Sequence, residues 1–169
     1  MAAPAIQLDH VTFQYDSQAE PTLHDINLTI QPGEKVLIVG PSGSGKSTLG
    51  NLINGLIPHA FPGKLSGTVT VNGTVVQDAS LATLSLQVGT VLQDPDAQFV
   101  ALTAGEDIAF ALENSAVAPS EMHTRVKKWA DRLKIGDLLA QAPQSLSGGQ
   151  KQRVAMAGVL IDEGDILLF

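Results

Sequence analysis

A glycine-rich loop restricts what this sequence can fold into more than any other feature. The run from Gly40 to Ser47 reads G-P-S-G-S-G-K-S and fits the pattern G-x-x-x-x-G-K-S. A short apolar and β-branched segment, 35–39, precedes the loop, and an apolar pattern with helical spacing follows it over 47–55. A strand, a glycine loop and a helix are therefore predicted in this order, with the strand at 35–39 buried in the centre of a sheet.

The residue types of this loop suit a phosphate group. Glycine adopts backbone angles closed to other residues, so the loop N–H groups can converge on an anion where the helix begins. The pattern predicts that Lys46 reaches the β- and γ-phosphates of a nucleotide, that Ser47 ligates Mg²⁺, and that Thr48 adds a phosphate contact. The predicted nucleotide-binding residues of this loop are Gly40, Pro41, Ser42, Gly43, Ser44, Gly45, Lys46, Ser47 and Thr48.

A second glycine-rich loop, 146–150, reads L-S-G-G-Q and precedes another helical apolar pattern over 151–161. Two glycines at the start of a helix again present free N–H groups, and Ser147 can cap the helix or donate its hydroxyl to a phosphate. One chain does not need two phosphate sites for one nucleotide. We therefore predict that the second loop acts in trans, on a nucleotide held by a partner subunit, through Leu146, Ser147, Gly148, Gly149 and Gln150.

With both loops in this order, the whole chain resembles the ATP-binding-cassette (ABC) ATPases. The resemblance implies an α/β fold: a P-loop NTPase (RecA-like) core, an N-terminal antiparallel β subdomain and a helical subdomain that carries the second loop, 146–150, which is the signature loop of the family. It implies one ABC ATPase domain over 1–169, with the helical subdomain at about 98–145. ATP and Mg²⁺ are the implied ligands, and ATP hydrolysis is the implied activity.

The resemblance assigns roles to two further residues. Tyr15 lies where the family places an aromatic ring against adenine, although an ordinary strand residue would also fit this position. Gln93, within V-L-Q-D-P, resembles the glutamine loop, whose glutamine contacts Mg²⁺ or the attacking water; an ordinary loop glutamine is the alternative. Gln93 is thus the one catalytic candidate, and Ser47 and Gln93 are the candidate Mg²⁺ ligands.

A finer resemblance is to the energy-coupling-factor ATPases. It rests on Q-D-P-D-A-Q-F at 93–99, on L-S-G-G-Q-K-Q-R-V-A-M-A-G-V-L at 146–160 and on N-G-L-I-P at 54–58. It implies the motor subunit of a membrane importer for a vitamin or a metal ion, peripheral on the cytoplasmic face of the membrane. The implied partners are a second ABC ATPase subunit, identical or different, a transmembrane coupling component and a substrate-binding membrane component. Two alternatives stay open: a soluble ABC ATPase without a transport role, and a nucleotide-binding fragment without catalysis.

The last residues, 165–169, have an apolar strand pattern. In this family such a strand continues into the Walker B Asp-Glu pair, and a switch histidine follows later. We therefore expect a chain that lacks its C-terminal core strands, the Walker B acids and the switch histidine, and that does not hydrolyse ATP detectably by itself. It would be either part of a longer subunit or a truncated product.

Composition narrows the class of protein. The formal net charge is −7 and the pI is about 4.8, which argues against a general nucleic-acid binder. No apolar run approaches the roughly 18–20 residues that span a bilayer, the first residues lack a signal peptide, and there is no cysteine. The chain is therefore predicted to be cytoplasmic. The one basic cluster, around Trp129 at 125–134, is interpreted as an amphipathic helix with a solvated charged face, and a patch that steers lipids or a partner is the alternative.

The remaining patterns predict local structure. Strands with alternating burial are expected at 6–15 and 23–30, a hairpin with an Asn-Gly turn at 67–76, and a buried strand at 88–92. The stretch 103–139 is expected to be helical with breaks near Pro119 and Gly136. Arg153 is expected to orient the helix after the second loop through a salt bridge. The four histidines are scattered, none lies at ligand spacing from a carboxylate, and they are expected at the surface or in turns. Gln98 and Phe99 are candidates for a groove that docks a transmembrane partner, and a core position is the alternative for Phe99.

Overall fold

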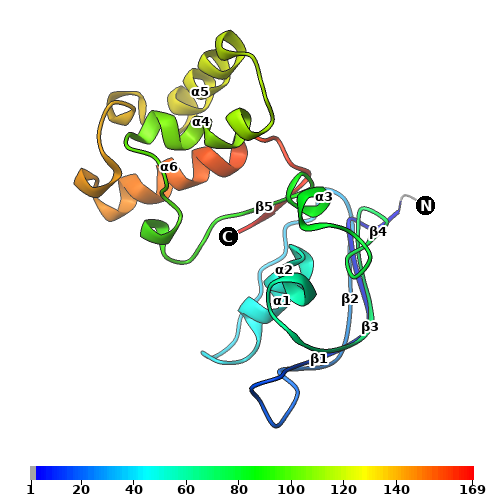
Figure 1. The fold of residues 1–169 in the computed structure, drawn as a ribbon. Helices are drawn as coiled ribbons and strands as arrows, with labels where there is room; N and C mark the ends of the chain where they lie inside the picture. Colours follow the sequence, from blue (N-terminus) through cyan, green and yellow to red (C-terminus); the bar gives the residue numbers. More distant parts are fainter. Residues whose placement is uncertain (1–2) are drawn as a thin grey trace. The chain divides into compact units, whose positions relative to one another are not determined.

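The structure is a computed structural model, and it describes residues 3–169. The chain divides into two compact units, of which the first ends at Val88 and the second begins at Gly89 (Figure 1). The first unit is built on an antiparallel sheet and the second is mainly helical. None of the helices within the described residues is both long and apolar enough to cross a membrane.

A four-stranded antiparallel sheet with the order β2-β1-β3-β4 organises the first unit. Asn72 and Gly73 connect β3 to β4 with φ values of 47° and 78°, as the predicted Asn-Gly hairpin turn requires. The elements are β1 (Ile6–Tyr15), β2 (Leu23–Ile30), α1 (Lys46–Ile53), α2 (Leu56–His59), β3 (Gly63–Val71), β4 (Thr74–Val75) and α3 (Leu81–Ser85). Both predicted N-terminal strands therefore have the expected bounds.

The alternation of buried and exposed residues in β1 is interrupted by a bulge. The buried positions Leu8 and Val11 are three residues apart, which regular alternation does not allow. Between the pairs Asp9↔Thr68 and Thr12↔Ser66, β1 has two residues where β3 has only Gly67. His10 is the extra residue, with φ of 50°, and it restores the inward orientation of the apolar side chains that follow.

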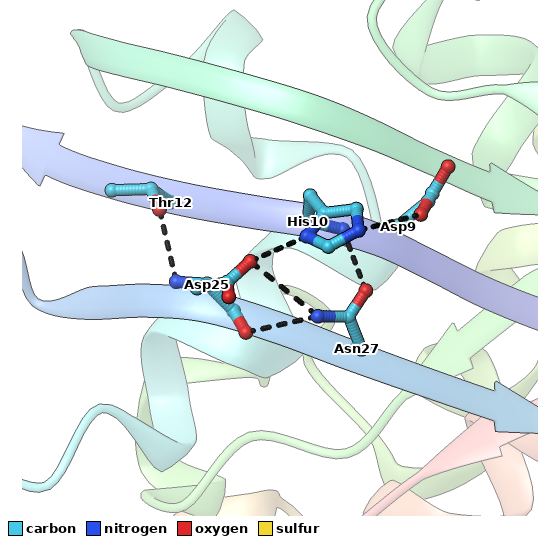
Figure 2. Close-up of polar contacts among 5 residues, drawn as sticks. All are labelled: Asp9, His10, Thr12, Asp25 and Asn27. Carbon is cyan, nitrogen blue, oxygen red and sulfur yellow. Dashed lines mark hydrogen bonds and ion pairs between the residues drawn. The ribbon is translucent and has the colours of Figure 1, made fainter.

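A second bulge lies on β2 beside the first. Leu23 and Ile26 are also three residues apart, and Asp25 has φ of 47°. Figure 2 shows how the two bulges are joined: His10 Nδ1 lies 2.7 Å from Asp25 Oδ1, and the His10 N–H donates to Asn27 Oδ1 at 2.9 Å. We call His10, Asp25 and Asn27 the bulge clip. His10 is exposed, as expected for the scattered histidines, and the strand register also gives it a carboxylate partner that its spacing in the sequence does not predict.

The segment 35–39 differs from the prediction. It forms no strand, and its apolar side chains are exposed, with 84% exposure at Leu37 and 78% at Val39. The physical reason is that the segment has no strand to pair with. No strand in the described part of the chain hydrogen-bonds to it, and the four-stranded sheet has β2 and β4 at its edges. Apolar, β-branched composition favours a strand, but a strand also needs a partner for its backbone N–H and C=O groups.

The second unit packs its helices around one apolar cluster. The cluster is formed by Ala104, Ile108, Leu112, Ala130, Ile135, Leu138, Leu146, Val154, Ala157 and Ile161. A short strand pair, β5 with β6, accompanies the helices. The elements are β5 (Val88–Thr90), η1 (Pro95–Ala97), α4 (Ala104–Asn114), α5 (Pro119–Leu133), η2 (Gly136–Leu138), η3 (Pro143–Ser145), α6 (Gly148–Leu160) and β6 (Ile166–Leu168).

The helix boundaries follow from local sequence signals. Thr103 caps α4, and Glu106 completes a capping box with it. Pro119 is the first residue of α5, a position that needs no backbone N–H donor. The basic cluster forms the amphipathic helix expected, because Val126, Trp129 and Leu133 of α5 pack on the apolar cluster. The strand at 88–92 is shorter than predicted: β5 stops at Thr90, and Leu92 is 43% exposed.

Candidate functional site

The glycines of the first loop give it a conformation that other residues would resist. Gly43 and Gly45 have φ values of 81° and 89°, in the left-handed region. A Cβ atom on Gly45 would also lie 2.8 Å from Leu23 Cδ2 and 3.1 Å from the Thr22 carbonyl oxygen. A Cβ atom on Gly40 would lie 2.7 Å from Ser44 Oγ. The loop is therefore tightly closed on itself and lies close to the start of β2.

The start of α1 is suited to an anion. Gly45 is the N-cap residue and supplies no side-chain cap, so the N–H groups of the first turn are not occupied by a capping side chain. Lys46 Nζ donates to the carbonyl oxygens of Gly40 and Pro41, at 2.9 Å and 2.7 Å, which places its positive charge over the loop. Ser47 is exposed, so its hydroxyl is open to a ligand. These features fit a phosphate group.

Tyr15 and Thr48 meet in the same unit. Tyr15 is the last residue of β1, and its hydroxyl lies 3.1 Å from Thr48 Oγ1. Thr48, in the first turn of α1, is 6% exposed. The structure thus connects two residues that were predicted separately as ring and phosphate contacts.

The second loop is arranged differently. Ser147 is the N-cap of α6 and forms a capping box with Gln150, whose Oε1 accepts a hydrogen bond from the Ser147 N–H at 2.8 Å. Cβ atoms added to Gly148 and Gly149 would meet nothing within 4 Å, so this helix start is open to approach from outside. Leu146 is 5% exposed and anchors the loop in the apolar cluster.

The glutamine loop is fastened to the helix of the second loop. Gln93 itself is exposed. Gln98 accepts from the Leu92 N–H at 3.1 Å and donates to the Ala155 carbonyl oxygen of α6 at 3.4 Å. Asp96 Oδ1 lies 2.5 Å from Lys151 Nζ, also on α6. No pattern in the sequence indicates this ion pair, since the two residues are distant in the chain.

The second unit also shows what Arg153 and Phe99 contact. Arg153 donates to the Gly149 carbonyl oxygen at 3.4 Å, and among residues 3–169 this contact within α6 takes the place of the salt bridge expected for it. Phe99 packs against the apolar cluster of the second unit, as its core interpretation predicts.

The predicted residues fall on both units. Tyr15 and the loop 40–48 belong to the first unit, whereas Gln93 and the loop 146–150 belong to the second. Within residues 3–169, no group of three or more His, Cys, Asp or Glu side chains could hold a metal ion. The Ser47 hydroxyl and the Gln93 amide oxygen are nevertheless ligand types that suit Mg²⁺, a hard cation that keeps several waters.

Comparison with known proteins identifies the family. Residues 23–169 match the ABC transporter family. The chain belongs to that family. This ABC ATPase chain is 59% identical over 169 residues to a protein of Lactiplantibacillus plantarum named as an ABC transporter ATP-binding protein, and 60% identical to a protein of Enterococcus faecalis with the same name. The matches cover 100% of the chain but 30% of each relative, so the chain spans about a third of their length.

A solved structure supports the fold. The chain is similar to CbiO1 from Clostridium perfringens, described as part of the ABC transporter complex CbiONQ. The TM-score is 0.84 with 30% sequence identity, over 97% of this chain and 64% of CbiO1. The predicted fold class is thereby confirmed: an α/β P-loop ATPase fold with an N-terminal antiparallel sheet and helices that carry the signature loop. The resemblance to energy-coupling-factor ATPases is also supported.

Proposed function

We propose that this chain is the nucleotide-binding part of an ATP-hydrolysing motor subunit of a membrane importer, of the energy-coupling-factor type, for a vitamin or a metal ion. The observation that carries this proposal is the similarity to CbiO1, which covers nearly the whole chain. The subunit would lie on the cytoplasmic face of the membrane. The 169 residues would act as one ABC ATPase domain, with the helical subdomain at about 98–145.

In this proposal the first loop binds the nucleotide. Lys46 and the loop N–H groups hold the β- and γ-phosphates, and Tyr15 stacks on the adenine ring. Ser47 and Gln93 hold Mg²⁺, which neutralises charge on the phosphates when bound. The exposed hydroxyl of Ser47 and the uncapped start of α1 support these assignments.

The second loop then serves a partner. Its glycines leave the start of α6 open, so a nucleotide held by a second ABC ATPase subunit can approach Gly148 and Gly149. Two subunits would pair head to tail and close on ATP, and a transmembrane coupling component and a substrate-binding component would follow this movement.

The test uses the full-length protein with whatever membrane proteins purify with it in mild detergent. We expect Mg²⁺-dependent ATP hydrolysis and co-purification of membrane components. After reconstitution into liposomes, we expect ATP-driven uptake of one substrate from a panel of labelled vitamins, Co²⁺ and Ni²⁺. Lys46→Met should abolish hydrolysis and uptake, whereas Lys64→Met, at an exposed position of β3, should change neither.

Three results would contradict the proposal. Hydrolysis stimulated by nucleic acid, without a membrane partner, would indicate a soluble ABC ATPase. Nucleotide binding without turnover in the full-length complex would indicate a non-catalytic subunit. Equal activity in Lys46→Met and the wild type would show that the first loop is not the nucleotide site.

A further inference from the structure

The hydrogen bond between Tyr15 and Thr48 connects two parts of the proposed site. Tyr15 ends β1, and Thr48 lies in the turn of α1 that directly follows the phosphate-binding loop. The oxygens are 3.1 Å apart. Thr48 is 6% exposed, so its hydroxyl is largely removed from water and gains a needed partner from this bond.

A second contact restricts the Tyr15 ring. The ring meets Phe13 edge to face, with centroids 4.7 Å apart and an interplanar angle of 81°. Phe13 is fully buried, and a Cβ atom on Gly63, which pairs with Tyr15 across β1 and β3, would lie 2.6 Å from the Phe13 ring. The ring is therefore held on one side by a tightly packed neighbour and at its hydroxyl by α1.

Stacking on adenine alone does not explain why this residue is a tyrosine, with a hydroxyl, rather than a phenylalanine. A phenylalanine ring would stack on adenine as well as a tyrosine ring does, because stacking uses only the flat aromatic face. We propose that Thr48 is a positioning residue: its hydroxyl holds the Tyr15 ring at a fixed place relative to the phosphate-binding loop. This inference rests on the proposed nucleotide binding, and it states that the base and phosphate parts of the site are preorganised as one unit.

Preorganisation predicts a specific pattern of affinities. When the ring is already in place, binding does not have to order it, so the hydrogen bond strengthens ATP binding without touching ATP. Loss of the bond should weaken ATP binding about three- to ten-fold, the range of one ordinary hydrogen bond. Inorganic tripolyphosphate has no base to stack, and its affinity should not change.

The experiment measures dissociation constants of ATP and tripolyphosphate for the full-length protein by calorimetry. The variants are Tyr15→Phe, Thr48→Val and the double variant, with Thr48→Ser as the conservative replacement. Thr29→Val, at an exposed position of β2, is the matched control. We expect similar losses of ATP affinity in both single variants, no further loss in the double variant, and recovery of most of the affinity in Thr48→Ser.

Other outcomes separate the explanations. If Thr48 instead contacts a phosphate directly, Thr48→Val will weaken tripolyphosphate as well as ATP, and its effect will add to that of Tyr15→Phe. If Tyr15→Phe binds ATP as the wild type does, the hydroxyl has no positioning role. Both results overturn this inference and leave the proposed function intact. A wild-type protein that binds neither ATP nor tripolyphosphate would instead overturn the proposed function itself.

Discussion

The two glycine-rich loops each precede a helix, but they use glycine for different reasons. In the first loop, Gly45 has a left-handed φ and no room for a Cβ atom, so its backbone conformation requires glycine. In the second loop, Gly149 is helical and a Cβ atom added to it would meet nothing within 4 Å. Glycine is needed for folding in the first loop, whereas in the second it keeps a helix start accessible.

The starts of the two helices also differ in how they are capped. No side chain caps α1, whereas Ser147 and Gln150 cap α6. The first helix start is therefore ready for an anion. At the second, the Ser147 N–H is engaged by the chain itself, so an anion approaching α6 would first meet the glycines or displace this cap.

The largest expected effect tests this contrast directly. Gly45→Ala should lower the free energy of unfolding of the full-length protein by about 2–4 kcal/mol, because it adds left-handed strain and steric overlap with Leu23. Gly149→Ala should leave that free energy unchanged or raise it by up to about 1 kcal/mol. Urea denaturation of both variants measures the difference, and equal destabilisation would contradict the comparison.

The next effect concerns the cap. Ser147→Ala should destabilise the protein by about 1 kcal/mol, because α6 loses its capping side chain. Ser42→Ala, at an exposed serine of the first loop, should stay within about 0.5 kcal/mol of the wild type. Thermal unfolding without nucleotide compares the two. A larger loss in Ser42→Ala would mean that the first loop, too, depends on a serine for its stability.

A smaller expected effect tests how the glutamine loop is attached to α6, the helix that begins at the second loop. The Asp96–Lys151 pair joins the glutamine loop to α6, and the Lys151 side chain is only 16% exposed. A double-mutant cycle with Asp96→Asn and Lys151→Met should give a coupling of about 0.5–1 kcal/mol, which decreases at high salt. Lys128 and Glu163, a more exposed pair on the same unit, provide the matched cycle and should couple less. Zero coupling for Asp96 and Lys151 would show that this ion pair does not help to fasten the segment to α6 in solution.

The smallest expected effect is a pH dependence of stability that is confined to the four-stranded sheet of the first unit. The Asp25 hydrogen bond, and then the charges of Asp25 and Asp9, raise the pKa of His10, and the bond to His10 lowers the pKa of Asp25. The histidine's contribution is therefore complete below its ordinary pKa of 6.5 and disappears as pH rises through the raised value. The aspartate's contribution is complete above its ordinary pKa of 3.8 and disappears at lower pH, so the clip is strongest between these two values.

His10→Asn tests this clip with little backbone strain, because asparagine tolerates a left-handed φ. The difference in melting temperature between wild type and variant should decrease as the pH rises from 6 to above neutrality. Hydrogen exchange should place the change in the first unit. A difference that does not vary with pH would show that the His10–Asp25 contact does not titrate.

Local signals in the sequence predicted much of the fold. The Asn-Gly turn has the expected left-handed φ values, and the break expected near Pro119 is the start of α5. The cap at Thr103 is also a local signal, although only the helical stretch that begins there was predicted. Leu8 and Val11 are three positions apart, and this spacing of buried apolar residues indicates a bulge. The simple alternation expected for this strand does not include one.

Contacts that depend on register or on a distant partner could not be predicted. Residues 35–39 have the composition of a buried strand, but composition does not say whether another strand pairs with it. The His10–Asp25 and Asp96–Lys151 contacts need the final arrangement of strands and helices, since the paired residues are 15 and 55 positions apart. The Tyr15–Thr48 bond is of the same kind.

The paired bulges also have a consequence for solubility. β2 forms one edge of the four-stranded sheet, and an edge strand with free N–H and C=O groups invites pairing with a second molecule. On this edge, Asp25 breaks the regular row of backbone groups, and its carbonyl oxygen accepts a hydrogen bond from the Asn27 side chain at 3.2 Å. The bulge clip thus opposes edge-to-edge association of two copies of the chain, a protection that a regular, straight β2 would lack.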